Sequence, residues 1–319
     1  MSGDVFAIVG DVGGTNCRFA LARRTSAGTE LLNLSTLTVA EFESFDAALE
    51  AYLSGLDHRP RFAAFALAGP KFDGCIQMTN VGWSASEKRL VDHFGFEHVS
   101  LSNDFAAMAR GAAIMPDVNF TDIISGPLNY ERNVAVLGPG TGLGVAGILS
   151  GQPPQILSTE GGFTAFTPRD DLEIEILKWL MGQLDFVAAE DIVSGPGLLN
   201  IYKALCNIHG QPIKFSAPSE VVSDAVYEGL SKQSVHVFCN ALGGFAGNTA
   251  HTLGATGGVI ITGGVAAHIA PFIDSSDFTE RFKQRGRSSW FTQNIPVRLL
   301  VAEATALYGA AAFITDREL

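Results

Sequence analysis

Short apolar runs alternate with amphipathic stretches through the first third of the chain, as expected where strands alternate with helices. The spacing of Phe42, Phe45 and Leu49 predicts a helix over 41–53. A capping box of Ser84 and Glu87 predicts a second helix start, and a third helix is predicted over 105–113. The apolar runs that predict strands lie at 5–9, 19–22, 31–39, 61–67 and 97–101.

After a loop-like stretch at 116–133, the second part of the chain repeats the opening pattern. Residues 134–137 and 143–149 predict two strands joined by a glycine turn, as at the start of the chain. Amphipathic stretches predict helices at 171–184, 219–230 and 235–253, and short apolar runs predict strands at 259–261 and 297–300. The repeat predicts two related α/β lobes, each offering one glycine turn to a shared cleft.

The first glycine turn, Gly10 to Asn16, could be a phosphate cradle. Gly13 and Gly14 remove side chains where the backbone must bend and approach a ligand closely. Exposed N–H groups and the Thr15 hydroxyl suit a phosphate, and the carboxylate of Asp11 suits a hydrated Mg²⁺. The alternative interpretation is an ordinary hairpin turn.

The second glycine turn, 138–144, pairs naturally with the first, so that Thr15 and Thr141 could face one polyphosphate. The G-x-G-x-x-G match at 142–147 is rejected as a dinucleotide motif, since a strand and a turn follow it instead of a helix. A third glycine cluster brackets the strand at 259–262 and includes Gly263. This cluster fits a nucleotide base and ribose, or simply a buried strand between tight turns.

Acidic residues mark three further positions. Asn103 and Asp104 end a predicted strand and enter a helix, where a carboxylate could accept a proton from an attacking hydroxyl or could simply cap the helix. Glu160 stands before two glycines and Glu190 precedes another glycine-rich stretch. Both carboxylates could accept hydrogen bonds from sugar hydroxyls, although Glu190 could equally be a solvated acid near a helix start.

Composition excludes several classes of function. A net charge of −12 argues against a nucleic-acid partner. The four cysteines form no C-x-x-C pair, so no structural zinc is expected. The apolar stretch 254–270 is too broken by glycine for a membrane span, and the N-terminus has no basic region of a signal peptide. We therefore expect a cytoplasmic protein that does not contact a membrane.

The assembled motifs resemble those of the bacterial glucokinase family, within the larger superfamily of sugar kinases and actin. The match extends over nearly the whole length, and the order and spacing of its motifs make it specific. It rests on GDVGGTN at 10–16 with Arg18 behind it, ALAGP at 66–70, MTNVGW at 78–83, SND at 102–104, GPGTGLG at 138–144, TEGG at 159–162, EDIVSGPGLLNIY at 190–202 and GGVIITGG at 257–264.

The resemblance implies two actin-like, ribonuclease H-like lobes with mixed sheets flanked by helices and an active-site cleft between them. The small domain would comprise 1–113 and about 302–319, and the large domain 114–301. The implied activity is phosphorylation of D-glucose at its 6-hydroxyl by ATP with Mg²⁺, and the implied assembly is a homodimer.

The resemblance also implies roles for individual residues. Asp104 is the catalytic base, with Asn103 beside it on the sugar, and Asp11 orients Mg²⁺ through water. The remaining implied sugar contacts are Glu160, Glu190, Thr79 and Asn80. The residues expected on ATP are Gly10, Asp11, Val12, Gly13, Gly14, Thr15, Gly138, Gly140, Thr141, Gly142 and Gly263.

One residue departs from the family pattern. The family usually has E-G-G-H at the third motif, with the histidine also on the sugar, whereas this chain has Phe163. A phenyl ring makes no such hydrogen bond, but it could pack on an apolar sugar face. Phe163 therefore leaves open a kinase of another hexose, such as mannose or an N-acetyl sugar. A separate alternative, from a different class, is a nucleotide-dependent sugar sensor with little transfer activity.

Overall fold

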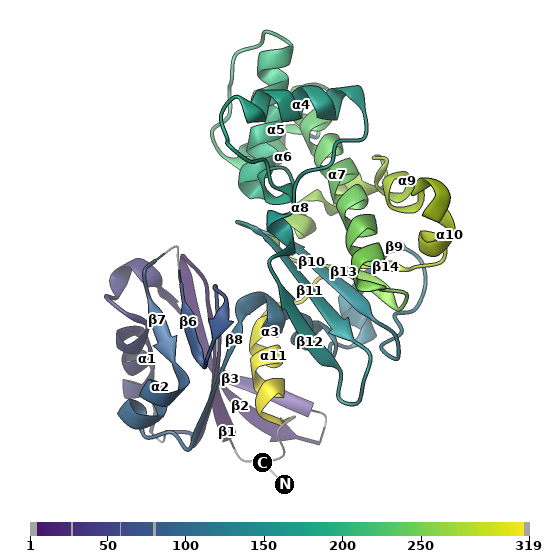
Figure 1. Cartoon of the computed structure of the whole chain (residues 1–319). Coiled ribbons are helices and arrows are strands. Elements are labelled where there is room, and N and C mark those ends of the chain that lie inside the picture. The colour runs from purple at the N-terminus through teal and green to yellow at the C-terminus, as the bar shows by residue number, and fades with distance from the viewer. Residues whose placement is uncertain (1–4, 27, 58, 79–80, 316–319) are drawn as a thin grey trace. The chain divides into compact units, whose positions relative to one another are not determined.

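The computed structural model describes residues 5–26, 28–57, 59–78 and 81–315, which form two compact units (Figure 1). Unit 1 comprises residues 1–115 and 302–319, and unit 2 comprises residues 116–301. Each unit has its own sheet and its own core. The two units are described one at a time below.

The described part of unit 1 is built on a five-stranded sheet in the order β3-β2-β1-β4-β8. β2 pairs antiparallel with β1 and β3, whereas β1, β4 and β8 run parallel. Unit 1 also has a small three-stranded sheet, in which the strands follow the chain order β5-β6-β7. The bounds are β1 Val5–Val12, β2 Asn16–Thr25, β3 Gly28–Thr38, α1 Phe45–Ser54, β4 Phe62–Leu67, β5 Lys71–Phe72, β6 Cys75–Gln77, β7 Ser84–Ser86, α2 Glu87–Phe94, β8 His98–Asn103, α3 Asp104–Ala112 and α11 Thr305–Thr315.

Side-chain size alternates along the central strands of unit 1. One face carries large side chains such as Phe19 and Phe65, which pack with Phe45 of α1. The other face carries alanines such as Ala20 and Ala64, which pack against α11. Because successive strand residues point to opposite faces, this alternation lets one face hold a thick aromatic core while the other admits a helix at close range.

The described part of unit 2 repeats this topology, with the strand order β12-β11-β10-β13-β14-β9. β11 pairs antiparallel with β10 and β12, and β10, β13 and β14 run parallel, as in unit 1. The internal repeat predicted from the glycine turns is therefore confirmed, and β9 is an addition at the sheet edge. The bounds are β9 Phe120–Ile124, β10 Val134–Pro139, β11 Leu143–Leu149, β12 Gln155–Thr159, α4 Asp171–Met181, α5 Gly195–Ile208, α6 Pro218–Asp224, α7 Leu230–Leu253, β13 Gly258–Ile261, α8 Gly264–Ile273, α9 Phe278–Lys283, α10 Ser289–Thr292 and β14 Val297–Leu300, with the short 3₁₀ helices η3 Gly161–Phe163, η4 Ala189–Asp191 and η5 Gly286–Ser288.

Several predicted helix boundaries are wrong. The helix predicted over 41–53 begins only at Phe45, because Ser44 caps it by accepting a hydrogen bond from the Ala47 N–H at 3.1 Å. The helix predicted over 219–230 ends at Asp224. Gly229, with φ of 147°, then precedes the long helix α7, which starts at Leu230. The stretch predicted as a loop before residue 134 contains the edge strand β9.

The capping box predicted for Ser84 and Glu87 is also wrong. Ser84 lies in β7, and Ser86 is the residue before α2. The Glu87 carboxylate points instead to β8 and accepts a hydrogen bond from the Leu101 N–H at 2.8 Å.

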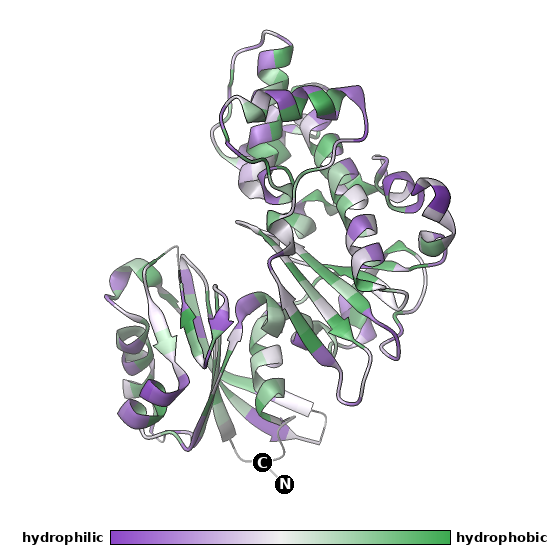
Figure 2. Ribbon diagram, viewed as in Figure 1, coloured by the Kyte–Doolittle hydropathy of each residue, from purple (hydrophilic) through white to green (hydrophobic). Residues whose placement is uncertain are grey.

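Each unit has a core of buried hydrophobic residues. Strands such as β10 and β11 are mostly hydrophobic along their length (Figure 2). In the part of the chain that the structure describes, no helix is long and apolar enough to cross a membrane.

Candidate active site

The first glycine turn is a three-residue connection between β1 and β2. Gly13, Gly14 and Thr15 form it, and Val12 pairs with Cys17 directly below it. The Gly13 N–H donates to the Asn16 carbonyl at 3.0 Å. Gly14 and Thr15 are exposed at the tip, so the turn can present backbone and a hydroxyl to a ligand.

Gly10 belongs to the strand and not to the turn. It is buried within β1, and an added Cβ would lie 2.8 Å from the ring of Phe65 and 2.9 Å from that of Phe19. Val12 is fully buried as well. Aromatic packing therefore explains the glycine at position 10. The exposed residues of the first turn are Gly14, Thr15 and Asn16, and Gly13 is half-buried.

The carboxyl ends of β1, β4 and β8 place Asp11 near Asn103 and Asp104. Asp11 is paired with Ala66 of β4, and Asn103 is paired with Leu67, the next residue of that strand. Parallel strands end at the same edge of a sheet, which is where ligands bind in open α/β folds. The sequence-predicted acids of unit 1 thus gather at one edge.

Asn103, and not Asp104, caps helix α3. Its Oδ1 accepts hydrogen bonds from the N–H groups of Phe105 and Ala106 at 2.9 and 3.0 Å. Asp104 is the first residue of the helix, and its Oδ1 accepts from the Phe105 N–H at 2.7 Å. The helix-cap alternative therefore applies to Asn103, and it leaves Asp104 available for chemistry.

Burial raises the pKa of both carboxyl groups. The pKa of Asp11 rises to about 6, chiefly because of burial and then because of the nearby Asp104 charge, while Arg18 opposes the rise. Burial also raises the pKa of Asp104, against the hydrogen bonds from the backbone. Because the Asp104 charge hinders the ionisation of Asp11, this pair of carboxyl groups favours a bound cation or proton.

Lys71 and Glu87 hold the edge strand that leads to Asp104. Lys71 Nζ donates to the Leu101 carbonyl at 2.8 Å and to Glu87 Oε1 at 2.7 Å. The same carboxylate oxygen accepts the Leu101 N–H. Since β8 is the last strand of its sheet, these two side chains replace the neighbouring strand that Leu101 lacks.

Replacing Glu87 with alanine is expected to destabilise unit 1 by about 1–3 kcal/mol, because the Leu101 N–H loses its acceptor. Urea unfolding followed by circular dichroism measures this change. Glu87→Gln keeps an acceptor oxygen and serves as the control, with a smaller expected loss. Equal stability of Glu87→Ala and the wild type would contradict this role of the side chain.

The second glycine turn joins β10 to β11 in unit 2. It consists of Gly140, Thr141 and Gly142, and the Gly140 N–H donates to the Gly142 carbonyl at 2.8 Å. Thr141 is exposed at the tip. Gly138 lies within β10 opposite Gly144. Each turn therefore joins two antiparallel strands through three residues and exposes a threonine. The closing pairs differ, since Val12 with Cys17 encloses four residues and Pro139 with Leu143 encloses three.

Glu190 lies against the second turn. Its Oε2 accepts a hydrogen bond from the Leu143 N–H at 2.7 Å, and a Cβ at Gly142 would lie 2.6 Å from the same oxygen. The carboxylate is half-buried, so it is not the freely solvated acid of the alternative interpretation. Its Oε1 makes no hydrogen bond to the described part of the chain, and this oxygen could accept one from a ligand.

The two glycines after Glu160 let its segment approach the start of β11, where Glu190 also makes its hydrogen bond. A Cβ at Gly162 would lie 2.2 Å from the Leu143 carbonyl, so only glycine permits η3 to approach β11 this closely. The Ala189 N–H donates to the Thr164 carbonyl at 2.7 Å, which places the segments after Glu160 and before Glu190 side by side. Phe163 is 59% exposed on the same short helix.

The third glycine cluster serves two purposes. β13 is fully buried, and a Cβ at Gly257 would lie 2.2 Å from the Asn129 carbonyl, as the buried-strand alternative predicted. Gly263, with φ of 94°, precedes α8, and its added Cβ would lie 2.7 Å from the Pro139 carbonyl. The positive end of α8 therefore starts beside the second turn, where it could favour an anion.

Thr79 and Asn80 lie outside the described residues. Among the residues that the structure describes, no group of three or more His, Cys, Asp or Glu side chains could hold a metal ion. Asp11 with Asp104 nevertheless fits Mg²⁺, which usually keeps several waters and binds through one or two carboxylates and substrate phosphates.

Comparison with known proteins gives one consistent result. The glucokinase family profile matches residues 8–317. The glucokinase of Caulobacter vibrioides is 40% identical over 315 residues, covering 97% of this chain and 95% of that protein. The crystal structure of a glucokinase from an Antarctic psychrotroph has a TM-score of 0.86 at 33% identity, over 97% and 98% of the two chains. A glucokinase from Streptomyces griseus, solved with glucose and AMPPNP, shares the fold with a TM-score of 0.67 at 17% identity, over 96% of this chain and 98% of that one.

Proposed function

The chain belongs to the glucokinase family, and on this premise we propose that it transfers the γ-phosphoryl group of ATP to the 6-hydroxyl of glucose with Asp104 as the base. It is thus an enzyme, a glucokinase, like its full-length relatives. The observation that carries the assignment of the base is the capping of α3 by Asn103, which frees the adjacent carboxylate of Asp104.

The proposed reaction uses Asp104 to activate the attacking oxygen. Asp104 takes the proton of the 6-hydroxyl while that oxygen forms a bond to the γ-phosphorus of ATP. The bond from the γ-phosphorus to the bridging oxygen breaks, and ADP leaves with the electron pair. A raised pKa supports this role, because a stronger base accepts the proton more readily near neutral pH.

For ATP, we propose that the turns at 13–15 and 140–142 and the start of α8 after Gly263 supply backbone N–H groups and hydroxyls to the phosphates. The presence in each unit of a glycine-rich turn with an exposed threonine between two antiparallel strands supports this assignment. Asp11 would hold Mg²⁺ through water, and the ion would neutralise charge on the phosphates. Within this scheme Gly10 and Gly138 act indirectly, by shaping the strands that lead into the turns.

For glucose, we propose that Glu160 and Glu190 accept hydrogen bonds from sugar hydroxyls, together with Asn103. Their convergence on the start of β11 supports a shared role for the two glutamates. Thr79 and Asn80 remain proposed sugar contacts by motif alone. A homodimer and a cytoplasmic location likewise remain proposals.

Phe163 provides the test of the sugar assignment. An exposed aromatic ring next to Glu160 could pack on the apolar face of a hexose. Phe163→Ala should raise KM for glucose several-fold with a smaller change in kcat, because stacking on the ring holds substrate and transition state alike. A coupled assay with glucose, mannose and N-acetylglucosamine measures this effect and ranks the sugars.

The control for this assay is Phe72→Ala, which removes another exposed ring, one that is not among the residues proposed to bind the sugar. Its kinetic constants should match the wild type. If mannose or N-acetylglucosamine were the better substrate of the wild type, glucose would not be the primary substrate. An unchanged KM in Phe163→Ala would remove this ring from the sugar site.

The raised pKa of Asp11 predicts the acid limit of activity. Asp11 and Asp104 must be ionised to hold the metal and to accept the proton. Since the pKa of Asp11 is about 6, compared with 3.8 for an ordinary aspartate, each fall in pH through this region protonates the pair and lowers kcat/KM. Because the two carboxyl groups interact, the pH at which activity falls is a property of the pair and not of one residue.

A pH profile of kcat/KM for glucose checks this prediction. Activity should increase as pH rises through about 6 and level off above it. Raising the Mg²⁺ concentration should move the acid limit to lower pH, because the cation favours the ionised form. A limit near pH 4, as for an ordinary carboxylate, would contradict the proposed coupling of the two groups.

A further inference from the structure

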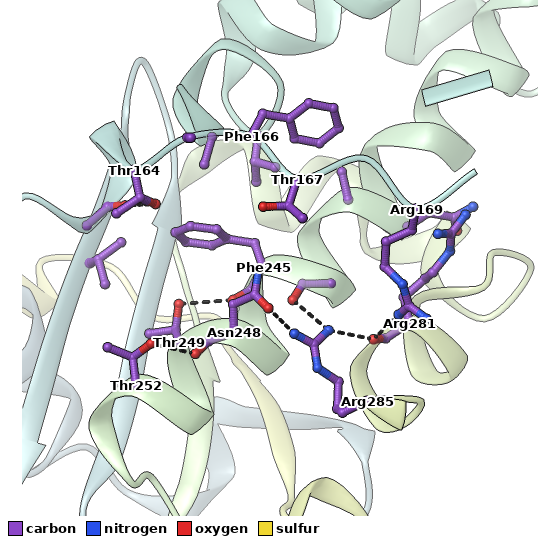
Figure 3. A pocket seen from close by; sticks show the side chains of 18 of the residues that line it. Thr164, Phe166, Thr167, Arg169, Phe245, Asn248, Thr249, Thr252, Arg281 and Arg285 are labelled. Atoms are coloured by element: carbon purple, nitrogen blue, oxygen red, sulfur yellow. Dashed lines mark hydrogen bonds between the residues drawn. The ribbon is translucent and has the colours of Figure 1, made fainter. Parts of the chain in front are cut away.

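A cavity of about 530 Å³ lies within unit 2, between the segment that follows Glu160, helix α7 and the end of α9 (Figure 3). Its volume falls in the range of small-molecule sites. None of the residues proposed above to bind glucose or ATP lines it. The cavity is therefore distinct from the proposed ligand-binding residues, although Gly161 and Ala189, which line it, are neighbours of Glu160 and Glu190.

Three arginines line one side of this cavity: Arg169, Arg281 and Arg285. Arg281 is neutralised, because it forms ion pairs with Asp170 and, at 3.4 Å, with the buried Glu173. Arg169 and Arg285 instead donate to carbonyl groups and an amide, and within the described part of the chain neither forms an ion pair with a carboxylate.

Arg285 is fixed in place by uncharged acceptors. Its Nη1 donates to the carbonyls of Gly244 and Arg281, each at 3.2 Å, and its Nη2 donates to Asn248 Oδ1. A Cβ at Gly247 would lie 3.2 Å from the Arg285 Cζ, so this glycine of α7 leaves the space that the guanidinium occupies. Burial and the nearby Arg169 charge lower the pKa of Arg285. A fixed, partly desolvated positive charge without a counter-ion is costly, and an anion would remove that cost.

The rest of the wall carries apolar, hydroxyl and amide side chains, together with the carboxylate of Glu173, which pairs with Arg281. Phe166 and Phe245 contribute rings, and Thr164, Thr249 and Thr252 lie on the side opposite the arginines in Figure 3. Thr249 and Thr252 donate their hydroxyl protons to the carbonyls of Phe245 and Asn248 at 3.0 and 2.9 Å. Their hydroxyl oxygens therefore retain lone pairs that can accept hydrogen bonds from hydroxyl groups of a ligand.

We propose that this cavity binds a small phosphate monoester on a polyhydroxylated carbon skeleton, a sugar phosphate, as a regulator of the enzyme. The phosphate would lie between Arg169 and Arg285, whose planar guanidinium groups suit phosphate oxygens. The carbon skeleton would extend over Phe245 toward the threonines.

The cavity wall connects directly to the proposed sugar ligands. Gly161 and Thr164 line it, and the Thr164 carbonyl accepts the Ala189 N–H next to Glu190. The Phe166 N–H donates to the Val187 carbonyl at 3.0 Å, which extends the same pairing. A ligand in the cavity would therefore bias the positions of Glu160 and Glu190 and change the affinity for glucose. This coupling rests on the proposed sugar roles of the two glutamates, whereas binding to the cavity does not.

Isothermal titration calorimetry with the full-length protein tests the site. Fructose 6-phosphate, glucose 6-phosphate and inorganic phosphate are titrated separately, each in the presence of saturating glucose. We expect the two sugar phosphates to bind, and inorganic phosphate to bind more weakly. Arg285→Gln and Arg169→Gln should each weaken sugar-phosphate binding at least tenfold. Arg287→Gln is the matched control, since this neighbouring arginine does not line the cavity, and its affinity should stay at the wild-type value.

The outcomes separate the two parts of the proposal. Absence of binding at millimolar sugar phosphate, or equal binding by wild type, Arg285→Gln and Arg169→Gln, would overturn the site. If the site binds, fructose 6-phosphate should change KM for glucose in the wild type and in Arg287→Gln, but not in Arg285→Gln. Binding without any change in KM would overturn the regulation while leaving the site and the glucokinase activity intact.

Discussion

Replacing Asp104 with asparagine is expected to lower kcat for glucose phosphorylation by about 10²–10⁴-fold, the range that general-base catalysis contributes. Asparagine has nearly the same shape as aspartate but cannot accept a proton at neutral pH. Its carbonyl oxygen still accepts the Phe105 N–H, so α3 should start as it does in the wild type. The loss should therefore fall on kcat, with little change in glucose affinity.

Steady-state kinetics with Mg²⁺·ATP give kcat, and calorimetry gives the glucose affinity of the same protein. The matched control is Asp92→Asn, an equally conservative change at an exposed position of α2 in the same unit. Its activity should equal that of the wild type. Near wild-type turnover by Asp104→Asn would show that another group accepts the proton, whereas loss of folded structure would appear in the circular dichroism spectrum.

The glycine turns could be predicted from sequence because their signals are local. Each turn has two apolar runs that pair with each other across a few residues, and the pairing of Val12 with Cys17 and of Pro139 with Leu143 follows from that pattern. The repeat of the whole topology follows in turn, since each hairpin begins a sheet with the same strand order. Acids at strand ends were equally visible, because parallel strands end at one edge.

The errors arose where a side chain has a distant partner. The spacing of Ser84 and Glu87 fits a capping box, but the Glu87 carboxylate gains more by satisfying the edge strand at Leu101 and the Lys71 ammonium. Gly10 sits beside true turn glycines in sequence, and only the rings of Phe19 and Phe65 reveal that it is needed for packing. Such contacts depend on the tertiary fold, which local patterns do not contain.

The arginine-lined cavity gave no signal in sequence. Arg169 follows the sugar-motif segment, whereas Arg285 lies between α9 and η5. The two come together because both pack against glycines of α7. The glycines of α7 could have indicated close packing on one helix face. A Cβ at Gly243 would lie 2.4 Å from the Phe278 carbonyl, and one at Gly247 would lie 3.0 Å from the Phe282 carbonyl.

Gly309→Ala is the second substitution with a large expected effect. We expect it to destabilise the fold, because α11 packs closely against α3 at Gly309. An added Cβ at Gly309 would lie 1.8 Å from the Ala107 carbonyl oxygen and 2.7 Å from the Gly111 nitrogen. Alanine favours a helix by only about 1 kcal/mol over glycine. Overpacking of a core typically costs about 1–3 kcal/mol, and here the obstacle is backbone, which cannot rotate away. We expect a net destabilisation of about 3 kcal/mol or more.

Urea unfolding followed by circular dichroism measures this destabilisation, and Gly55→Ala in the same unit is its control. The Cβ of an alanine at position 55 would lie 3.6 Å from the Tyr52 carbonyl, an ordinary contact, so its stability should stay near the wild-type value. Because α3 begins at Asp104, any Gly309→Ala protein that still folds must shift the helix that carries the proposed base, and its kcat should fall as well. A stable and fully active Gly309→Ala variant would contradict the close contact of the two helices, and with it the rigid support that α11 gives to the catalytic carboxylate.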